Sequence, residues 1–300
     1  EPDRLTLGGE MREMSILFCD IRGFTAVSER HSPENLTRLI NRFLTPLTQV
    51  ILDRSGTIDK YMGDCIMAFW NAPVDVPDHA LKACQSALAM MSALEQLNNE
   101  LSSEAAKSFS LQQNKTGDGI SLHRGTLHGS TTELLRVGVG INTGTACVGN
   151  LGSEQRFDYS ALGDSVNLAS RLEGQSKTYG VDILLAEETY AAASRLAAVE
   201  LDLVQVVGKT EPVRIFALIG DEAVKDSTGF DRLIRLQKDM LGAYRERQWD
   251  NALEIIRQLR NDAAAISMTR YYDMFDERVT EFMAAPPDSD WDGVERRLVK

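Results

Sequence analysis

The stretch Leu17–Thr25, "LFCDIRGFT", ends an apolar run with a carboxylate and continues with a glycine, an aromatic residue and a hydroxyl. Side chains alternate along a strand, so Leu17 and Cys19 face one side. Phe18 and Asp20 face the other, and Asp20 therefore leaves at the strand end, where it can meet solvent or a ligand. The glycine turn that follows offers backbone N–H groups that suit phosphate oxygens. By itself, an Asp-x-x-Gly turn is more often structural.

A second stretch, "DKYMGDCIMAFW" at residues 59–70, places a Gly63–Asp64 turn before an apolar strand, as a β-hairpin requires. Turn chemistry alone would explain Asp64. If the two strands are neighbours, however, Asp20 and Asp64 can share one hard divalent cation, or two about 4 Å apart bridged by phosphate. Two carboxylates in one site need that positive charge, because like charges repel.

The third stretch, "FDYSALGDSVNLASRLEGQ" at residues 157–175, predicts a helix that begins with Asp164 at or near its N-cap. Asn167 and Arg171 are four residues apart, so they share one helix face at about 6 Å along the axis. An amide and a guanidinium on such a face also occur as an ordinary solvated stripe, and these residues alone favour that interpretation.

Composition narrows the function classes. The chain has 300 residues and a formal net charge of -12, which argues against a nucleic-acid polymer as partner. No apolar run reaches the roughly 18 to 20 residues of a membrane helix. The four cysteines lack Cys-x-x-Cys spacing, so they indicate a reducing, cytoplasmic setting rather than a zinc site or disulfides. Because the sequence starts with Glu1, we expect a fragment whose parent carries an upstream sensor or membrane anchor.

Short apolar runs alternate with helical patterns and predict an α+β protein. The predicted strands are residues 14–19, 66–70, 137–141, 181–185, 203–207 and 213–218. Helical spacing predicts helices over residues 33–55 and from residue 78 to about residue 97. Residues 101–135 are rich in Ser, Thr, Gly, Asn and Gln and predict a flexible insertion. Residues 227–300 predict a run of amphipathic helices that forms a C-terminal extension.

The conjunction of motifs decides between these interpretations. "ILFCDIRGFT", "DKYMGDCIMAFW", "VGVGINTG" and "YSALGDSVNLASRLE" stand in the order and wording of the class III nucleotidyl cyclase catalytic domain, which residues 10–220 closely resemble. The stretches "LTLGGE" and "DSDWDGVERRLVK" further resemble bacterial cyclases with an upstream extracytoplasmic sensor and membrane spans. The resemblance implies a ferredoxin-like (palm-type) domain over residues 1–220, located in the cytoplasm. It also implies a head-to-tail homodimer with active sites at its interface.

The resemblance implies a role for each matching residue. It implies that two Mg²⁺ or Mn²⁺ ions are bound by Asp20, the backbone of Ile21, and Asp64. It implies a triphosphate loop formed by the backbone of Ile21, Gly23, Phe24 and Thr25. It implies substrate recognition by Lys60 and Ser160 at the base, Asn167 at the ribose, Arg171 at the transferring phosphate and Lys209 near the triphosphate. The reaction expected is conversion of ATP to 3',5'-cyclic AMP and pyrophosphate.

The base-reading positions favour ATP. Lys60 only donates hydrogen bonds, which suits adenine N1 better than the N1–H of guanine. Ser160 stands where many adenylyl cyclases have aspartate, and its hydroxyl can accept from the adenine amino group or donate to a ring nitrogen. The alternatives are a guanylate or dual-specificity cyclase and a catalytically silent nucleotide-binding module. A fourth is a protein that binds partners through residues 227–300.

Replacing Arg171 with alanine is expected to abolish most turnover and leave dimerisation intact. An arginine on a transferring phosphoryl group contributes roughly 10³ to 10⁵ in rate in phosphoryl-transfer enzymes. Cyclic nucleotide formation and the sedimentation of Arg171→Ala, measured side by side, test this. Normal activity in that variant would remove Arg171 from the mechanism.

Overall fold

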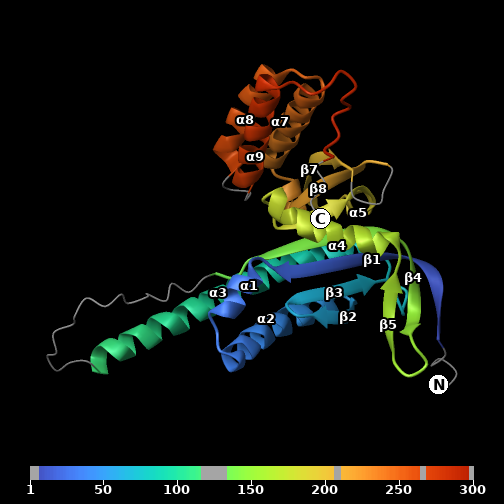
Figure 1. Cartoon of the computed structure of the whole chain (residues 1–300), viewed down its shortest axis with the longest axis vertical. Coiled ribbons are helices and arrows are strands. Elements are labelled where there is room, and N and C mark those ends of the chain that lie inside the picture. Colours follow the sequence, from blue (N-terminus) through green and yellow to red (C-terminus); the bar gives the residue numbers. More distant parts are fainter. Residues whose placement is uncertain (1–6, 116–133, 206–210, 264–267, 297–300) are drawn as a thin grey trace.

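The computed structural model describes residues 7–115, 134–205, 211–263 and 268–296, and it shows a mixed α+β fold as predicted (Figure 1). The strands are β1 (Gly8–Ile21), β2 (Thr57–Met62), β3 (Cys65–Trp70), β4 (Val137–Gly152), β5 (Phe157–Leu162), β6 (Ile183–Ala186), β7 (Ala197–Val204) and β8 (Val213–Gly220). The helices are α1 (Phe24–Glu29), α2 (Pro33–Asp53), α3 (His79–Lys115), α4 (Asp164–Thr178), α5 (Glu187–Ala192), α6 (Glu222–Lys225), α7 (Thr228–Arg245), α8 (Trp249–Ala263) and α9 (Thr269–Ala284). None of the helices in the described ranges is long and apolar enough to cross a membrane.

The sheet has the order β2-β3-β1-β4-β6-β8-β7, with β5 paired to β4. All pairings are antiparallel except that of β4 with β6. Strand β1 lies inside the sheet, and its side chains alternate between two apolar cores as predicted. Leu17 and Cys19 pack in the core beneath α2 and α3. Ile16 and Phe18 pack on the opposite face, together with residues of α4.

The predicted strand at residues 203–207 was misplaced, because β7 spans Ala197–Val204. Its sequence, "AAVELDLV", carries two acidic residues that break the apolar pattern. Asp202 is nevertheless buried, because Arg278 of α9 lies 2.6 Å from it in an ion pair. A carboxylate is buried only when it is paired, and its partner here is 76 residues away in the sequence. Strand β5 was not predicted either, and β2 was implied only as the first arm of the hairpin at Gly63–Asp64. The side chains of both strands are mostly half-buried or exposed.

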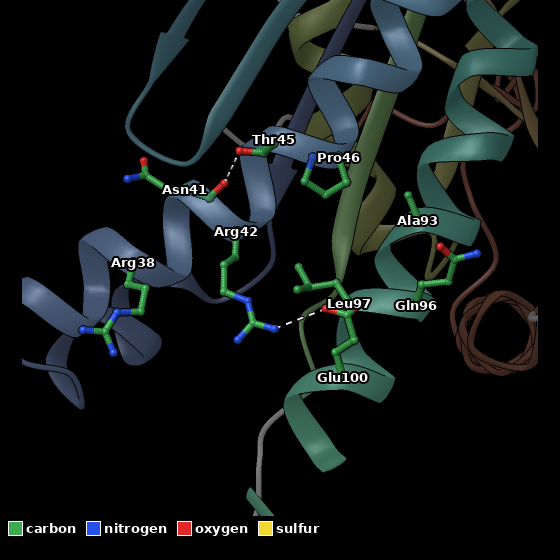
Figure 2. A pocket seen from close by; sticks show the side chains of 9 residues that line it. All are labelled: Arg38, Asn41, Arg42, Thr45, Pro46, Ala93, Gln96, Leu97 and Glu100. Atoms are coloured by element: carbon green, nitrogen blue, oxygen red, sulfur yellow. Dashed lines mark hydrogen bonds and ion pairs between the residues drawn. The ribbon is translucent and has the colours of Figure 1, made fainter. Parts of the chain in front are cut away.

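The loop predicted from residue 101 was wrong for residues 101–115, which continue α3. These residues include Ala, Glu, Lys, Gln and Leu, which are good helix formers even without an apolar stripe. The remainder of the predicted insertion lies largely outside the described residues. Figure 1 shows this end of α3 running away from the sheet. Across a groove of about 510 Å³ between α2 and α3, Arg42 pairs with Glu100 at 3.2 Å (Figure 2). Arg42 also pairs with Glu104 at 2.7 Å.

The helices after Gly220 share a continuous core with β7, β8 and the end of α4. Polar contacts join the layers at the same place: the Tyr271 hydroxyl donates to the Leu201 carbonyl at 2.7 Å. The chain then returns to the sheet, where the N–H of Glu295 donates to the Leu203 carbonyl at 2.8 Å and its carbonyl accepts from Gln205 N–H at 3.0 Å. The predicted helical extension therefore packs as a layer on the sheet.

Replacing Arg278 with methionine is expected to lower the free energy of unfolding by about 3–5 kcal/mol, because it leaves the Asp202 carboxylate buried without its cation. The side chain of Asp202 has no exposed surface, and that of Arg278 is 8% exposed. Urea denaturation followed by circular dichroism measures the loss.

The matched control is Arg257→Met on α8, whose side chain is 66% exposed and pairs with Glu254 on the surface. Its cost should stay below about 1 kcal/mol. Equal stability of the Arg278 and Arg257 variants would show that the buried pair does not hold the helical layer on the sheet.

Candidate active site

Two aspartates meet at one end of the sheet, where β1 and the β2–β3 hairpin lie side by side. Antiparallel pairing of β1 with β3 sets Cys19 opposite Ile66. Asp20, after Cys19, and Asp64, before Ile66, therefore both lie just beyond this pair at the same end of the sheet. The predicted hairpin is confirmed, and Gly63 takes the left-handed conformation (φ 68°) that its turn requires. The Ile21 N–H donates to Asp64 Oδ2 at 3.2 Å, which ties the turn to the end of β1.

The carboxylate pair is electrostatically unbalanced. Burial raises the pKa of Asp20 to about 7, and a hydrogen bond with Asp64 and the negative charge of Asp64 add to that rise. Oxygen Oδ1 of Asp20 is buried and has no hydrogen-bond partner among the described residues. A buried carboxylate oxygen without a donor is costly, and a cation is the group that would satisfy both carboxylates.

The turn after β1, where the phosphate loop is predicted, contains a glycine that caps the next helix. Gly23 is left-handed (φ 71°) and caps α1, with its carbonyl accepting from Ala26 N–H at 3.0 Å. The Arg22 side chain turns away from the loop into the protein. It donates to the Val181 carbonyl and lies 3.3 Å from an oxygen of Asp182. Arg22 therefore ties the loop to the protein interior. The N–H groups of Phe24 and Thr25 belong to the first turn of α1.

The two predicted base-reading residues lie together, and a third residue joins them. Lys60 of β2 and Ser160 of β5 both contact Asp59. The Ser160 hydroxyl donates to Asp59 Oδ2 at 2.7 Å, and Lys60 Nζ lies 3.2 Å from Asp59 Oδ1. Asp59 was not predicted as a site residue, because neighbours on a regular strand face opposite sides. A register shift between Ile58 and Lys60 makes Asp59 the extra residue of a β-bulge, a feature that re-aims side chains.

Helix α4 begins at Asp164, directly after its Gly163 cap, in agreement with the prediction. Asn167 is exposed, Arg171 is half-buried, and neither side chain bonds to any described residue. The helix presses against β4 at glycines: a Cβ on Gly140 would lie 2.2 Å from the backbone N of Glu173. Lys209, the remaining predicted substrate contact, lies outside the described residues.

The side of α4 opposite Asn167 and Arg171 faces the carboxylate pair, Asp20 and Asp64, of its own chain. Gly138 pairs with Asp20 across β1 and β4, and a Cβ on Gly138 would lie 2.7 Å from Glu173 Oε1. Burial raises the pKa of Glu173 to about 7, although the Arg22 charge opposes that rise. Residues two apart on a helix are about 200° apart around its axis. Arg171 therefore leaves α4 on a different side from Glu173, directed away from Asp20.

Comparison with known proteins agrees with this geometry. The family of adenylate and guanylate cyclase catalytic domains matches residues 9–220. An adenylate cyclase of Anabaena cylindrica is 38% identical over 210 residues, which cover 68% of this chain and 36% of that protein. Adenylate cyclase 1 of Rhizobium meliloti (strain 1021) is 31% identical over 210 residues, which cover 70% of this chain and 28% of that protein. The chain thus spans about a third of the length of these relatives.

The similar solved structures include both an adenylyl cyclase and a guanylyl cyclase. The adenylyl cyclase CyaB from P. aeruginosa aligns with a TM-score of 0.51 at 31% identity, covering 72% of this chain and 97% of that one. A guanylyl cyclase aligns with a TM-score of 0.55 at 33% identity, covering 72% of this chain and 95% of that one. The chain belongs to the class III adenylate and guanylate cyclase catalytic domain family, and its palm-type fold is that of the family.

Replacing Gly140 with alanine is expected to lower the free energy of unfolding by about 1–3 kcal/mol, because the new methyl group meets the backbone of α4 and forces it outward. The atoms in its way are backbone N and O of Glu173 and Ala169, at 2.2 and 2.3 Å, and they cannot rotate aside. Thermal or urea unfolding measures the loss.

Gly174→Ala, on the exposed side of the same helix, is the matched control. A Cβ there has no heavy atom within 4 Å, and alanine is a better helix former than glycine. We expect this variant to gain about 0.5–1 kcal/mol. A Gly140 variant as stable as wild type would contradict the close seating of α4 on β4.

Proposed function

We propose that this chain is the catalytic unit of an adenylate cyclase that converts ATP to 3',5'-cyclic AMP and pyrophosphate. The observation that carries the proposal is the unbalanced pair Asp20 and Asp64 beside a phosphate-loop turn, in a chain of the cyclase family. The reaction needs the ribose 3'-hydroxyl to approach the α-phosphorus of its own nucleotide. Orientation of the ribose and neutralisation of phosphate charge are therefore the tasks for the surrounding side chains.

The carboxylate pair fits two divalent cations, Mg²⁺ or Mn²⁺. Within the described ranges no group of three or more His, Cys, Asp or Glu side chains is arranged around a metal position. A two-carboxylate site suits Mg²⁺, which commonly binds one or two carboxylates and takes its other ligands from water and substrate phosphates. In the proposal Asp20, Asp64 and the backbone of Ile21 hold the ions. When bound, the ions supply Lewis-acid charge at the attacking and leaving oxygens.

The direction of Arg171 supports a site shared between two copies of the chain. The side chains of Arg171 and Asn167 leave α4 away from the Asp20 edge of their own chain. Neither side chain bonds to a described residue. In a homodimer the same two side chains would meet the nucleotide held at the Asp20 edge of the partner. Asn167 would orient the ribose, and Arg171 would neutralise charge on the transferring phosphate. Lys209 would contact the triphosphate, and two complete sites follow from twofold symmetry.

Base selection is assigned to Lys60 and Ser160. Lys60 can only donate hydrogen bonds, which fits the acceptor N1 of adenine. A guanylate or dual-specificity cyclase is the second candidate, since a solved guanylyl cyclase is 33% identical to this chain. A silent nucleotide-binding module is the third, and the presence of Asp20, Asp64 and Arg171 weighs against it.

The wider setting is also a proposal. The four cysteines are free thiols, as expected of a protein that works on ATP in a reducing cytoplasm. Because the chain spans only about a third of its relatives, we place it within a longer signalling protein that carries an upstream sensor or membrane anchor.

Incubation with ATP or GTP should yield cyclic AMP as the main product, and only when Mg²⁺ or Mn²⁺ is present. Chromatography of the products identifies the nucleotide, and an excess of chelator provides the metal-free arm. Activity should rise faster than linearly with protein concentration, because sites form only in the dimer.

Each arm has a result that contradicts one part of the proposal. Failure to form a cyclic product from either nucleotide with either metal would remove the enzymatic function. Equal activity with chelator present would remove the metal requirement. Specific activity that is constant over a wide dilution range, with sedimentation as a monomer, would remove the shared site.

A further inference from the structure

The side chain of Asp59 lies between the two base-reading residues and has no exposed surface. Its Oδ2 accepts two hydrogen bonds, one from the Ser160 hydroxyl at 2.7 Å and one from the Ala161 N–H at 3.3 Å. Its Oδ1 accepts no hydrogen bond from a described residue, and Lys60 Nζ faces it at 3.2 Å. Both oxygens thus face donors, so the Asp59 side chain acts as an acceptor in these contacts.

This contact fixes the polarity of Ser160. A hydroxyl has one hydrogen to donate and two lone pairs that accept. The Ser160 hydrogen is committed to Asp59, so the oxygen offers only lone pairs to a ligand. Ser160 is 6% exposed, and on β5 it pairs with Gly149 of β4. The ambivalent hydroxyl expected from the sequence is therefore an acceptor in the structure.

Lys60 has the opposite polarity. Its ammonium group is a donor only, and its side chain is 41% exposed, so it can reach a ligand while its charge stays opposed by Asp59. The bulge at Asp59 brings an acceptor at Ser160 and a donor at Lys60 to the same carboxylate. A ligand edge that matches them must present a donor next to an acceptor.

We propose that Asp59 is a specificity-determining residue that sets the site for adenine by holding Ser160 as an acceptor and Lys60 as a donor. The inference rests on the proposed cyclase function and deepens it. Adenine presents an amino donor at position 6 and an acceptor at N1, which match Ser160 and Lys60. Guanine presents an oxygen at position 6 and N1–H, so oxygen would face oxygen and a donor would face a donor. Asp59 acts through its two neighbours, which makes it a positioning residue for the base.

The test compares kcat/KM for ATP with kcat/KM for GTP in a set of variants. Asp59→Ala frees the Ser160 hydrogen to donate to guanine, and the ATP-to-GTP ratio should fall by about tenfold or more. Asp59→Asn should keep most of the preference, because its amide oxygen can accept the same hydroxyl hydrogen. In Ser160→Ala the added Asp59→Ala change should lower the ratio less than it does in the unaltered chain, since the part of its effect that passes through Ser160 is already lost.

Unchanged preference in Asp59→Ala, or full additivity in the double variant, would overturn the assignment of Asp59. Nucleotide analogues test it in the unaltered chain, independently of whether the variants fold. Inosine triphosphate, which has oxygen at position 6, should be used as poorly as GTP. Efficient cyclisation of inosine triphosphate would show that Ser160 donates, and would also overturn the assignment.

Binding separates this inference from the proposed function. Calorimetry with 3'-deoxy-ATP and 3'-deoxy-GTP, which cannot be cyclised, measures base preference without turnover. Tighter binding of 3'-deoxy-ATP that is lost in Asp59→Ala would support the inference even in a chain that forms no product. Cyclisation of ATP with no base preference in binding or turnover would leave the cyclase function standing and reject the role of Asp59.

Discussion

Repulsion between two carboxylates at one edge of a sheet is the constraint on which the site depends. The antiparallel pairing of β1 with β3 brings Asp20 and Asp64 together, and the Ile21 N–H holds the hairpin turn in place. In this contact the pKa of Asp20 is raised, and one of its buried oxygens lacks a hydrogen-bond donor among the described residues. Such an arrangement favours positive charge beside the turn that follows β1.

Helix α4 is the second element that shapes the site. Glycines on β4 let the helix backbone approach the sheet, so that Glu173 packs behind Asp20. The side chains of Arg171 and Asn167 lie on another side of the helix and bond to no described residue. Helix α4 thus packs beside the Asp20–Asp64 end of its own chain, and its other side carries the guanidinium group of Arg171 and the amide of Asn167. A symmetric pair of chains is the simplest arrangement that uses both faces.

Sequence patterns predicted the α+β class, the strand ending at Asp20, the hairpin at Asp64 and the start of α4, because each depends on local alternation or turn chemistry. They failed where a distant contact overrides the local pattern. The acidic residues of β7 concealed a strand, since Asp202 is buried only by virtue of Arg278 in α9. Asp59 was missed for a related reason. Its role depends on a bulge in β2 and on Ser160, 101 residues away.

The return of the chain to β7 at Glu295 has a consequence for assembly. Backbone hydrogen bonds with Leu203 and Gln205 cover the last residues of the edge strand β7, where N–H and C=O groups would otherwise be open. Open edges invite strand-by-strand growth between molecules. With this end of β7 covered, that edge of the sheet offers less open backbone for another copy of the chain to pair with.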